Sequence, residues 1–166
     1  MKKRDFDIAF RGLALGQHEF QYDLDDTFFT LFEYSDYRGL RGTTELKMLK
    51  SETVLDLEFH FAGSIETPCD ITNEMYTQVL KNSFVMQIKF GDEYNDENEE
   101  LLILPHGNYE FNAAQMIYEL VVLSIPSKLL GPNAGNGIED LIEEEEDETE
   151  EKTDPRWDQL KNLLNK

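Results

Sequence analysis

Alternation of apolar and polar residues at a period of two constrains the fold of this chain more than any other feature. In the clearest run, polar residues alternate with Leu55, Leu57, Phe59, Phe61 and Ile65. Shorter alternating or apolar runs occupy five further segments: Phe6–Phe10, Phe20–Leu24, Leu46–Met48, Phe84–Phe90 and Leu101–Leu104. Such alternation puts the apolar side chains on one side of a sheet, and it is typical of antiparallel sheets with one solvated face. The pattern predicts a strongly curved antiparallel sheet or a partly closed barrel.

Two of these runs are close enough in sequence to pair directly. Gly12 and Gly16 lie between the Phe6–Phe10 and Phe20–Leu24 runs. Because glycine favours turns between alternating runs, we expect these two segments to form a hairpin.

Helices are expected at three places, which makes the fold class α+β with two or three helices. A short helix over Asp25–Phe32 follows the second alternating run. Asn112 is a suitable N-cap for a helix from Ala113 to about Leu123, whose apolar residues share one stripe. Asp154 followed by Pro155 is a strong helix start, because proline fits the first helical position.

Charge divides the chain unevenly. The 166 residues include 15 Lys and Arg against 35 Asp and Glu, a formal net charge of −20. Residues 1–50 hold 8 basic and 9 acidic residues, whereas residues 51–166 hold 7 and 26. Ten of the thirteen residues from 139 to 151 are acidic, and like charges at this density favour an extended linker. We therefore predict a sheet domain with a packed helix over 1–130, a Gly-rich loop and acidic linker over 131–153, and a C-terminal helix over 154–166.

Composition excludes several classes of protein. The excess of acidic residues argues against a general phosphate-binding protein, which carries surplus Lys and Arg. No stretch approaches the ~18 consecutive apolar residues of a membrane-spanning helix. The single cysteine cannot form an internal disulfide, which suits a reducing compartment. We expect a cytoplasmic protein with no membrane association.

No group of residues predicts catalysis. His18, His60 and His106 lack the spacing of zinc hydrolases or of a nucleophile with its base. Cys69 has no local thiol partner, because position 72 is Thr, and we expect it to be buried where a strand enters a turn. The sequence predicts a non-enzymatic protein without a metal site, a cofactor or a small-molecule substrate.

One candidate binding segment is basic and aromatic, and its residues are RNA-binding candidates: Tyr37, Arg38, Arg41, Lys47 and Lys50. The glycines of Tyr37–Gly42 predict a flexible loop between the first helix and the third strand. Arginines on such a loop, beside exposed tyrosines, suit phosphates and unpaired bases. The alternative is ordinary surface charge that balances nearby acidic residues.

A second candidate joins the acidic tract to the last helix. Its residues are protein-binding candidates: Glu143, Glu144, Glu145, Glu146, Asp147, Trp157 and Leu160. The tract suits capture of a basic partner, to which the helix presents an apolar face. The alternative is a solubilising linker followed by a helix that packs on its own sheet.

The order of several motifs resembles a known family. Phe6–Leu13 followed by Gly16–Phe20 resembles the opening of the YceD family, the large ribosomal RNA subunit accumulation proteins. Cys69-Asp70 after the longest strand is similar to that family's cysteine-containing turn, and Glu119–Pro126 is similar to its helix ending at a Leu/Ile-Pro step. Near the C-terminus, the family's last motif is similar to three residues here: Asp154, Pro155 and Arg156.

The resemblance implies a non-enzymatic factor that supports accumulation of 23S rRNA and assembly of the large ribosomal subunit. Its partners would be large-subunit rRNA or its precursor, and a basic large-subunit ribosomal protein. Many relatives carry a second cysteine where this chain has Thr72, so no metal or redox role is transferred to Cys69. The alternative function is an acidic module that holds basic proteins without touching RNA.

Overall fold

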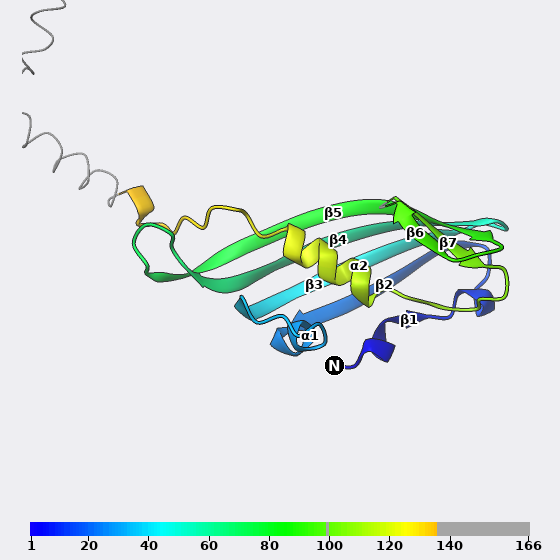
Figure 1. The fold of residues 1–166 in the computed structure, drawn as a ribbon, viewed down its shortest axis with the longest axis horizontal. Helices are drawn as coiled ribbons and strands as arrows, with labels where there is room; N and C mark the ends of the chain where they lie inside the picture. Colours follow the sequence, from blue (N-terminus) through cyan, green and yellow to red (C-terminus); the bar gives the residue numbers. More distant parts are fainter. Residues whose placement is uncertain (99, 136–166) are drawn as a thin grey trace, which may run out of the picture.

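The computed structural model describes residues 1–98 and 100–135, and a six-stranded sheet dominates it (Figure 1). Each strand of the sheet is antiparallel to its neighbours, apart from the parallel pair β5 and β7. In spatial order the strands are β2 (Gly16–Asp25), β3 (Arg38–Lys50), β4 (Val54–Pro68), β5 (Met75–Gly91), β7 (Leu101–Pro105) and β6 (Asn95–Asn98).

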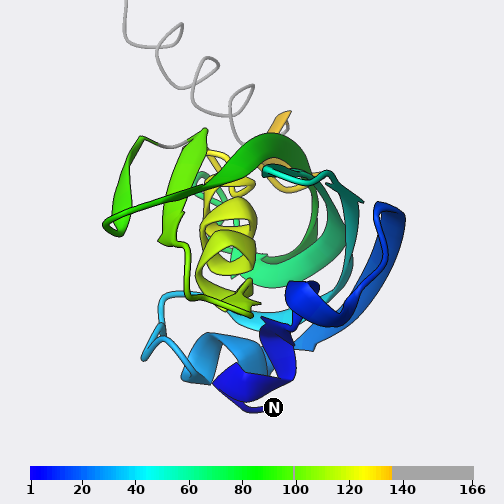
Figure 2. The ribbon, with the colours of Figure 1, turned by 90° about the vertical axis from the view of Figure 1, so that its right-hand side faces the viewer.

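The sheet curves around the helix α2 (Ala114–Leu123), which lies against its inner face (Figure 2). It does not close, because β2 and β6 are the two ends of the strand order. The predicted α+β class with a curved, mostly antiparallel sheet is confirmed, whereas the barrel is not observed.

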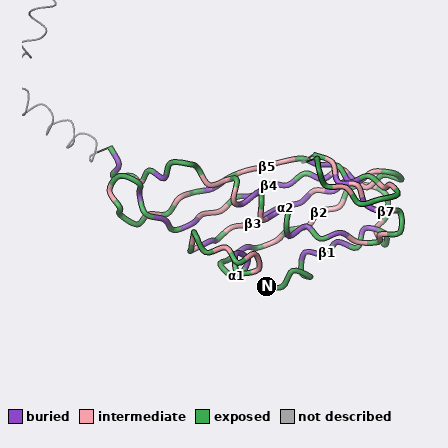
Figure 3. Tube along the Cα trace, viewed as in Figure 1, coloured by how far each residue is buried: buried purple, intermediate pink, exposed green. Residues whose placement is uncertain are grey.

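The alternation of apolar and polar residues along the strands decides which side chains lie on the inner face of the sheet. Leu46, Phe59 and Phe84 lie side by side on β3, β4 and β5, and the rings of Phe59 and Phe84 stack with centroids 4.7 Å apart. Buried and exposed positions alternate along the long strands (Figure 3). The five apolar residues of the β4 run are all buried: Leu55, Leu57, Phe59, Phe61 and Ile65.

β7 departs from the antiparallel pairing of the other strands. β7 lies between β5 and β6, and it runs parallel to β5. Its sequence Leu101–Pro105 is apolar on both sides, which suits an interior strand, whereas β6 carries Asp96 and Glu97 and takes the edge.

The predicted hairpin between the first two alternating runs is wrong. Residues 6–10 contribute only the two-residue strand β1 (Asp7–Ile8), which pairs with β8 (Phe111–Asn112). Two 3-10 turns flank β1: η1 (Lys3–Phe6) and η2 (Phe10–Gly12). Phe6, Ile8 and Phe10 are nevertheless buried, so the alternation identified core residues correctly but not their pairing partner.

Two helices were predicted within the described residues, and both are confirmed. α1 (Asp26–Thr30) is shorter than expected, and the carboxylate of Asp25 caps it by accepting from the backbone N–H of Thr27 at 2.9 Å. The amide oxygen of Asn112 accepts from the N–H of Ala114 at the start of α2. The third predicted helix, over 154–166, lies outside the described residues.

The β4–β5 hairpin projects beyond the other strands, and the segment after α2 returns to its tip (Figure 1). Asp70 joins the two: its backbone N–H donates to the carbonyl of Leu129 at 2.8 Å, and its carboxylate accepts from the Leu129 N–H at 2.7 Å. Asn133 donates to the carboxylate of Glu74 at 2.9 Å. These contacts fasten residues 129–133 to the turn between the strands.

Replacing Phe59 by Ala should lower the free energy of unfolding by about 3–5 kcal/mol, because it empties a fully buried site and removes the stack on Phe84. Urea denaturation followed by circular dichroism measures the change. Val85→Ala is the control on the neighbouring strand: the Val85 side chain is 62% exposed, so its loss should change stability by no more than about 0.5 kcal/mol. Equal effects of the two substitutions would contradict this account of the core.

Candidate functional site

The side of the sheet that faces away from α2, here called the outer face, is a candidate binding surface in the described part of the chain. It carries side chains of both charges from β2 to β5. Its acidic members are Glu19, Asp23, Glu45, Asp56, Glu58 and Glu66. Its basic members are Arg38, Arg41, Lys47, Lys81 and Lys89. Because the two signs alternate across neighbouring strands, no large basic patch forms.

Apolar side chains are also exposed on the outer face. Leu49, Val79 and Val85 have 50%, 63% and 62% of their surface exposed. Scattered single apolar residues are common on protein surfaces, but these three lie on strands whose other face is already filled by the core. The outer face therefore offers apolar contact as well as charge.

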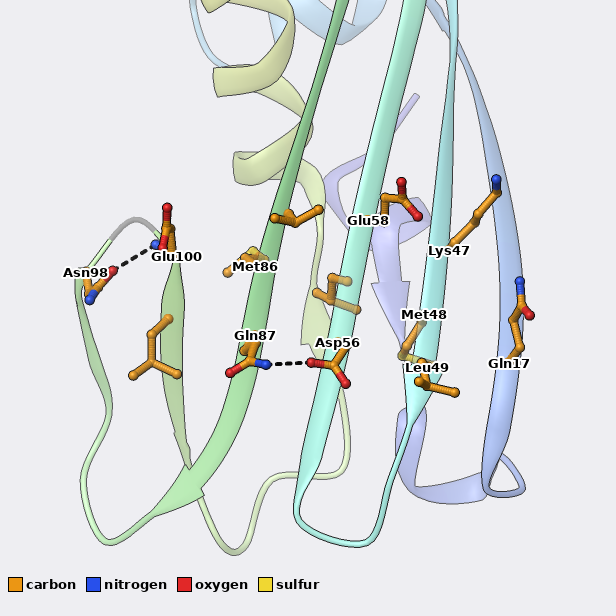
Figure 4. Close-up of a pocket in the computed structure, with 13 residues that line it drawn as sticks. Gln17, Lys47, Met48, Leu49, Asp56, Glu58, Met86, Gln87, Asn98 and Glu100 are labelled. Carbon is orange, nitrogen blue, oxygen red and sulfur yellow. Dashed lines mark hydrogen bonds between the residues drawn. The ribbon is translucent and has the colours of Figure 1, made fainter.

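A groove of 680 Å³ lies at one end of the outer face, across β2 to β5 and beside the turn between β6 and β7 (Figure 4). The Gln87 side chain donates to the Asp56 carboxylate at 2.7 Å across its floor. Lys47 and Glu58 lie further along the groove, and Glu100 lines its far wall. The groove is shallow, and its lining mixes polar side chains with apolar ones such as Leu49, Val85 and Leu101.

The predicted flexible loop over Tyr37–Gly42 is wrong, because β3 begins at Arg38. The carboxylate of Asp26 accepts from the backbone N–H of Leu40 at 2.8 Å, which fastens the start of β3 to α1. A register shift lies between Arg38 and Arg41, and Gly39 has a φ of +68° there. Arg38 and Arg41 are exposed on the outer face, on a strand rather than on a loop.

The remaining RNA-binding candidates are not gathered with the arginines. Tyr37 is half-buried, and its ring contacts Tyr34, which in turn packs edge-on against Tyr118 of α2. Lys50 faces the inner side, where its ammonium donates to the carbonyls of Phe10 at 2.9 Å and Leu13. Of the five candidates, Arg38, Arg41 and Lys47 share the outer face.

Two further basic residues on this face were missed by the sequence reasoning. Lys81 and Lys89 are exposed on β5, at the polar positions of its alternation. The Phe84–Phe90 run contained the signal for Lys89, because a polar residue between its apolar members points outward. Lys81 precedes that run and lies at the same phase of β5. Neither lysine is close in sequence to Arg38 or Arg41, and only the sheet places these residues of separate strands on one face.

Cys69 lies where β4 enters the turn, and it is 3% exposed, as predicted from the sequence. Hydrogen bonds from the backbone N–H and the hydroxyl of Thr72, and from the backbone of Gly131 and Ile71, lower the pKa of its thiol from 9.0 to about 7. The thiolate form is therefore stabilised by a ring of donors, with no basic side chain among them. The described residues contain no group of three or more His, Cys, Asp or Glu side chains that would hold a metal.

The acidic tract and the last motif lie outside the described residues. This applies to all the protein-binding candidates and to part of the family motif: Glu143, Glu144, Glu145, Glu146, Asp147, Asp154, Pro155, Arg156, Trp157 and Leu160. Their roles stay predictions.

Replacing Thr72 by Val should raise the pKa of Cys69 above its value of about 7, because the substitution removes the hydroxyl donor and leaves the backbone donors in place. The ultraviolet absorbance of the thiolate, followed below about pH 9, reports this group, because the chain has one cysteine and tyrosine ionises at higher pH, with an ordinary pKa of about 10. Thr77→Val is the matched control on the neighbouring strand. An unchanged titration midpoint in Thr72→Val would show that this hydroxyl does not stabilise the thiolate.

Comparison with known proteins agrees with the resemblance noted in the sequence. No helix in the described ranges is long and apolar enough to cross a membrane. No curated protein matches the chain. No solved structure matches it either. The model of the family described as large ribosomal RNA subunit accumulation protein YceD matches residues 57–164, which is more than half of the chain. The β4–β5 hairpin from Leu57 onward, the Cys69 turn and α2 fall within this match, and the chain belongs to the YceD family.

Proposed function

We propose that this protein is a non-enzymatic factor that supports 23S rRNA accumulation and assembly of the large ribosomal subunit in the cytoplasm. It does so by contacting a basic large-subunit ribosomal protein, rRNA or its precursor, or both. The observation that carries the proposal is the family match over residues 57–164, because the family is named for large ribosomal RNA subunit accumulation.

Charge favours a basic protein as the main partner. Residues 1–135 contain 23 Asp and Glu against 11 Lys and Arg, and the tract from 139 to 151 adds ten acidic residues. A surface of this sign attracts cationic partners and speeds their association, whereas it repels a polyphosphate backbone. Ribosomal proteins that bind rRNA are rich in Lys and Arg, so they match this surface.

Direct RNA contact, if made, depends on the outer face. Arg38 and Arg41 are exposed at neighbouring positions of β3, and Lys47 lies further along the same strand. Because only these few Lys and Arg side chains would contact phosphates, binding would release few counterions from the RNA. We therefore expect modest RNA affinity with a shallow dependence on salt.

Replacing Arg38 and Arg41 together by Ala should reduce ultraviolet crosslinking of the tagged protein to large-subunit rRNA in cells. With a purified transcript of 23S rRNA, the slope of log affinity against log salt should fall by ~1.4–1.8, from two lost phosphate contacts. Arg4→Ala with Lys128→Ala is the matched control, because both side chains are exposed and neither lies on β2–β5.

RNA crosslinking that survives the Arg38 and Arg41 substitutions unchanged would remove the outer-face arginines from the proposal. Adducts with ribosomal proteins alone would favour the second candidate function, an acidic module that holds basic proteins without touching RNA. The excess of carboxylates on the described residues is the observation that favours this candidate.

Deleting residues 139–151 should reduce crosslinking to basic ribosomal proteins severalfold, because it removes ten carboxylates. A variant in which those ten residues are replaced by Gln and Ser keeps the length of the segment and separates charge from spacing. Equal recovery of ribosomal-protein adducts from the neutral variant and the natural chain would exclude the tract as a binding element.

A further inference from the structure

β2 presents a long backbone edge without a partner in the described part of the chain. All ten of its residues pair with β3, and β2 is the first strand in the order of the sheet. It is an end strand of the curved sheet, and the N-terminal segment that contains β1 passes beside it without forming a backbone hydrogen bond to it (Figures 1 and 2). No described backbone group outside the sheet forms a hydrogen bond with the β2 backbone.

Such an edge is a template for another strand. In an antiparallel ladder, every second residue directs its N–H and C=O away from the existing partner. Over ten residues, about five residues of β2 therefore present both groups to whatever lies beside them, along about 33 Å.

The side chains along β2 specify what an added strand must contain. Phe20 and Tyr22 point to the inner side and are only half-buried, although both pack against the core. Glu19 and Asp23 alternate with them and are exposed on the outer face. The Tyr22 ring already stacks on Phe6, with centroids 5.0 Å apart. A strand beside β2 would extend this apolar cover over the exposed parts of Phe20 and Tyr22, and would place its other residues next to the two carboxylates.

The two carboxylates are held outward by neighbouring side chains. Gln17 donates to the carboxylate of Glu19 at 3.3 Å, and the hydroxyl of Thr43 donates to that of Asp23 at 3.0 Å. A carboxylate accepts several hydrogen bonds, so both retain lone pairs for a cation on an added strand.

The same charges exclude a second copy of this chain. Antiparallel pairing of two β2 edges would bring the acidic side chains of one copy beside those of the other, which destabilises a strand pair. The net charge of −20 on each copy adds to the repulsion. Lys or Arg at the outward positions of an added strand would instead lie beside the carboxylates of Glu19 and Asp23, and each pair would attract.

We propose that the edge of β2 binds an extended segment of a basic partner protein as an added β-strand, in which Lys or Arg alternates with apolar residues. Backbone hydrogen bonds supply affinity, and the alternation of aromatic and acidic positions supplies selectivity. The inference deepens the proposed function, on which it rests for the identity of the partner as a ribosomal protein. It assigns the binding of that partner to β2 rather than to the acidic tract alone.

The test uses the full chain and a fluorescent, end-blocked peptide of about eight residues that alternates Lys and Val, long enough to span most of β2. Two control peptides keep its charge: one has the Lys residues grouped before the Val residues, and the other carries N-methyl groups on alternate backbone amides. Fluorescence anisotropy should show binding of the alternating peptide at least about tenfold tighter than either control. Hydrogen exchange should slow in β2 when the alternating peptide is bound.

Glu19→Lys with Asp23→Lys should weaken binding of the alternating peptide by about tenfold, because both substitutions put a cation beside each peptide Lys. Glu52→Lys with Glu93→Lys is the matched control: it changes the net charge equally at exposed positions before β4 and after β5. Circular dichroism verifies that both variants keep the fold.

Three results would overturn the inference: equal binding of the N-methylated peptide, equal losses in the two variants, or slowed exchange that does not include β2. Because the peptide assay contains no ribosomal component, its failure alongside ribosomal adducts in cells rejects the strand-addition site alone. Binding at β2 without any ribosomal adduct in cells rejects the proposed function and keeps the site.

Discussion

The pairing of β4 with β3 and β5 is the interaction on which the rest of the structure depends. β4 spans fifteen residues, and every one of them has a partner on β5. Its inward side chains fill the centre of the core, so a slip of one residue would turn all of them to solvent. All the buried side chains of β4 together therefore hold the pairing register. The same register decides which charged side chains lie on the outer face.

Close approach of backbone to backbone is part of that pairing. Gly42 and Gly63 lie opposite each other on β3 and β4, and the ring of Phe61 lies against both. A Cβ atom at Gly42 would lie 2.6 Å from the Phe61 ring, and one at Gly63 would lie 2.7 Å from it. Because neither glycine has a side chain, β3 and β4 can pair closely under the Phe61 ring. This point lies next to the start of β3, where Arg38 and Arg41 are exposed.

The negative charge at the edges of the sheet bears on both self-association and the proposed recognition of a basic partner. Both edges of the sheet carry carboxylates, on β2 at Glu19 and Asp23 and on β6 at Asp96 and Glu97. Charged side chains on sheet edges oppose association with like chains. The same side chains favour a cationic strand or segment, which is the chemistry of the basic partner proposed above.

What the sequence determined by itself is the buried face of the long strands β2 to β5, the start of α2, the burial of Cys69 and the fold class. These follow from local rules, since alternation needs only neighbouring residues and a cap needs only the next turn. The sequence did not determine that Phe6–Phe10 pairs with β8, that β7 lies beside β5, or that Lys50 binds the carbonyls of Phe10 and Leu13. Of the five RNA-binding candidates, only those with outward positions on β3 share one surface, and Lys81 and Lys89 join them from another strand. Tertiary structure alone decided these points, because partner choice depends on the packing of segments distant in sequence, and alternation is the same whichever strand lies alongside.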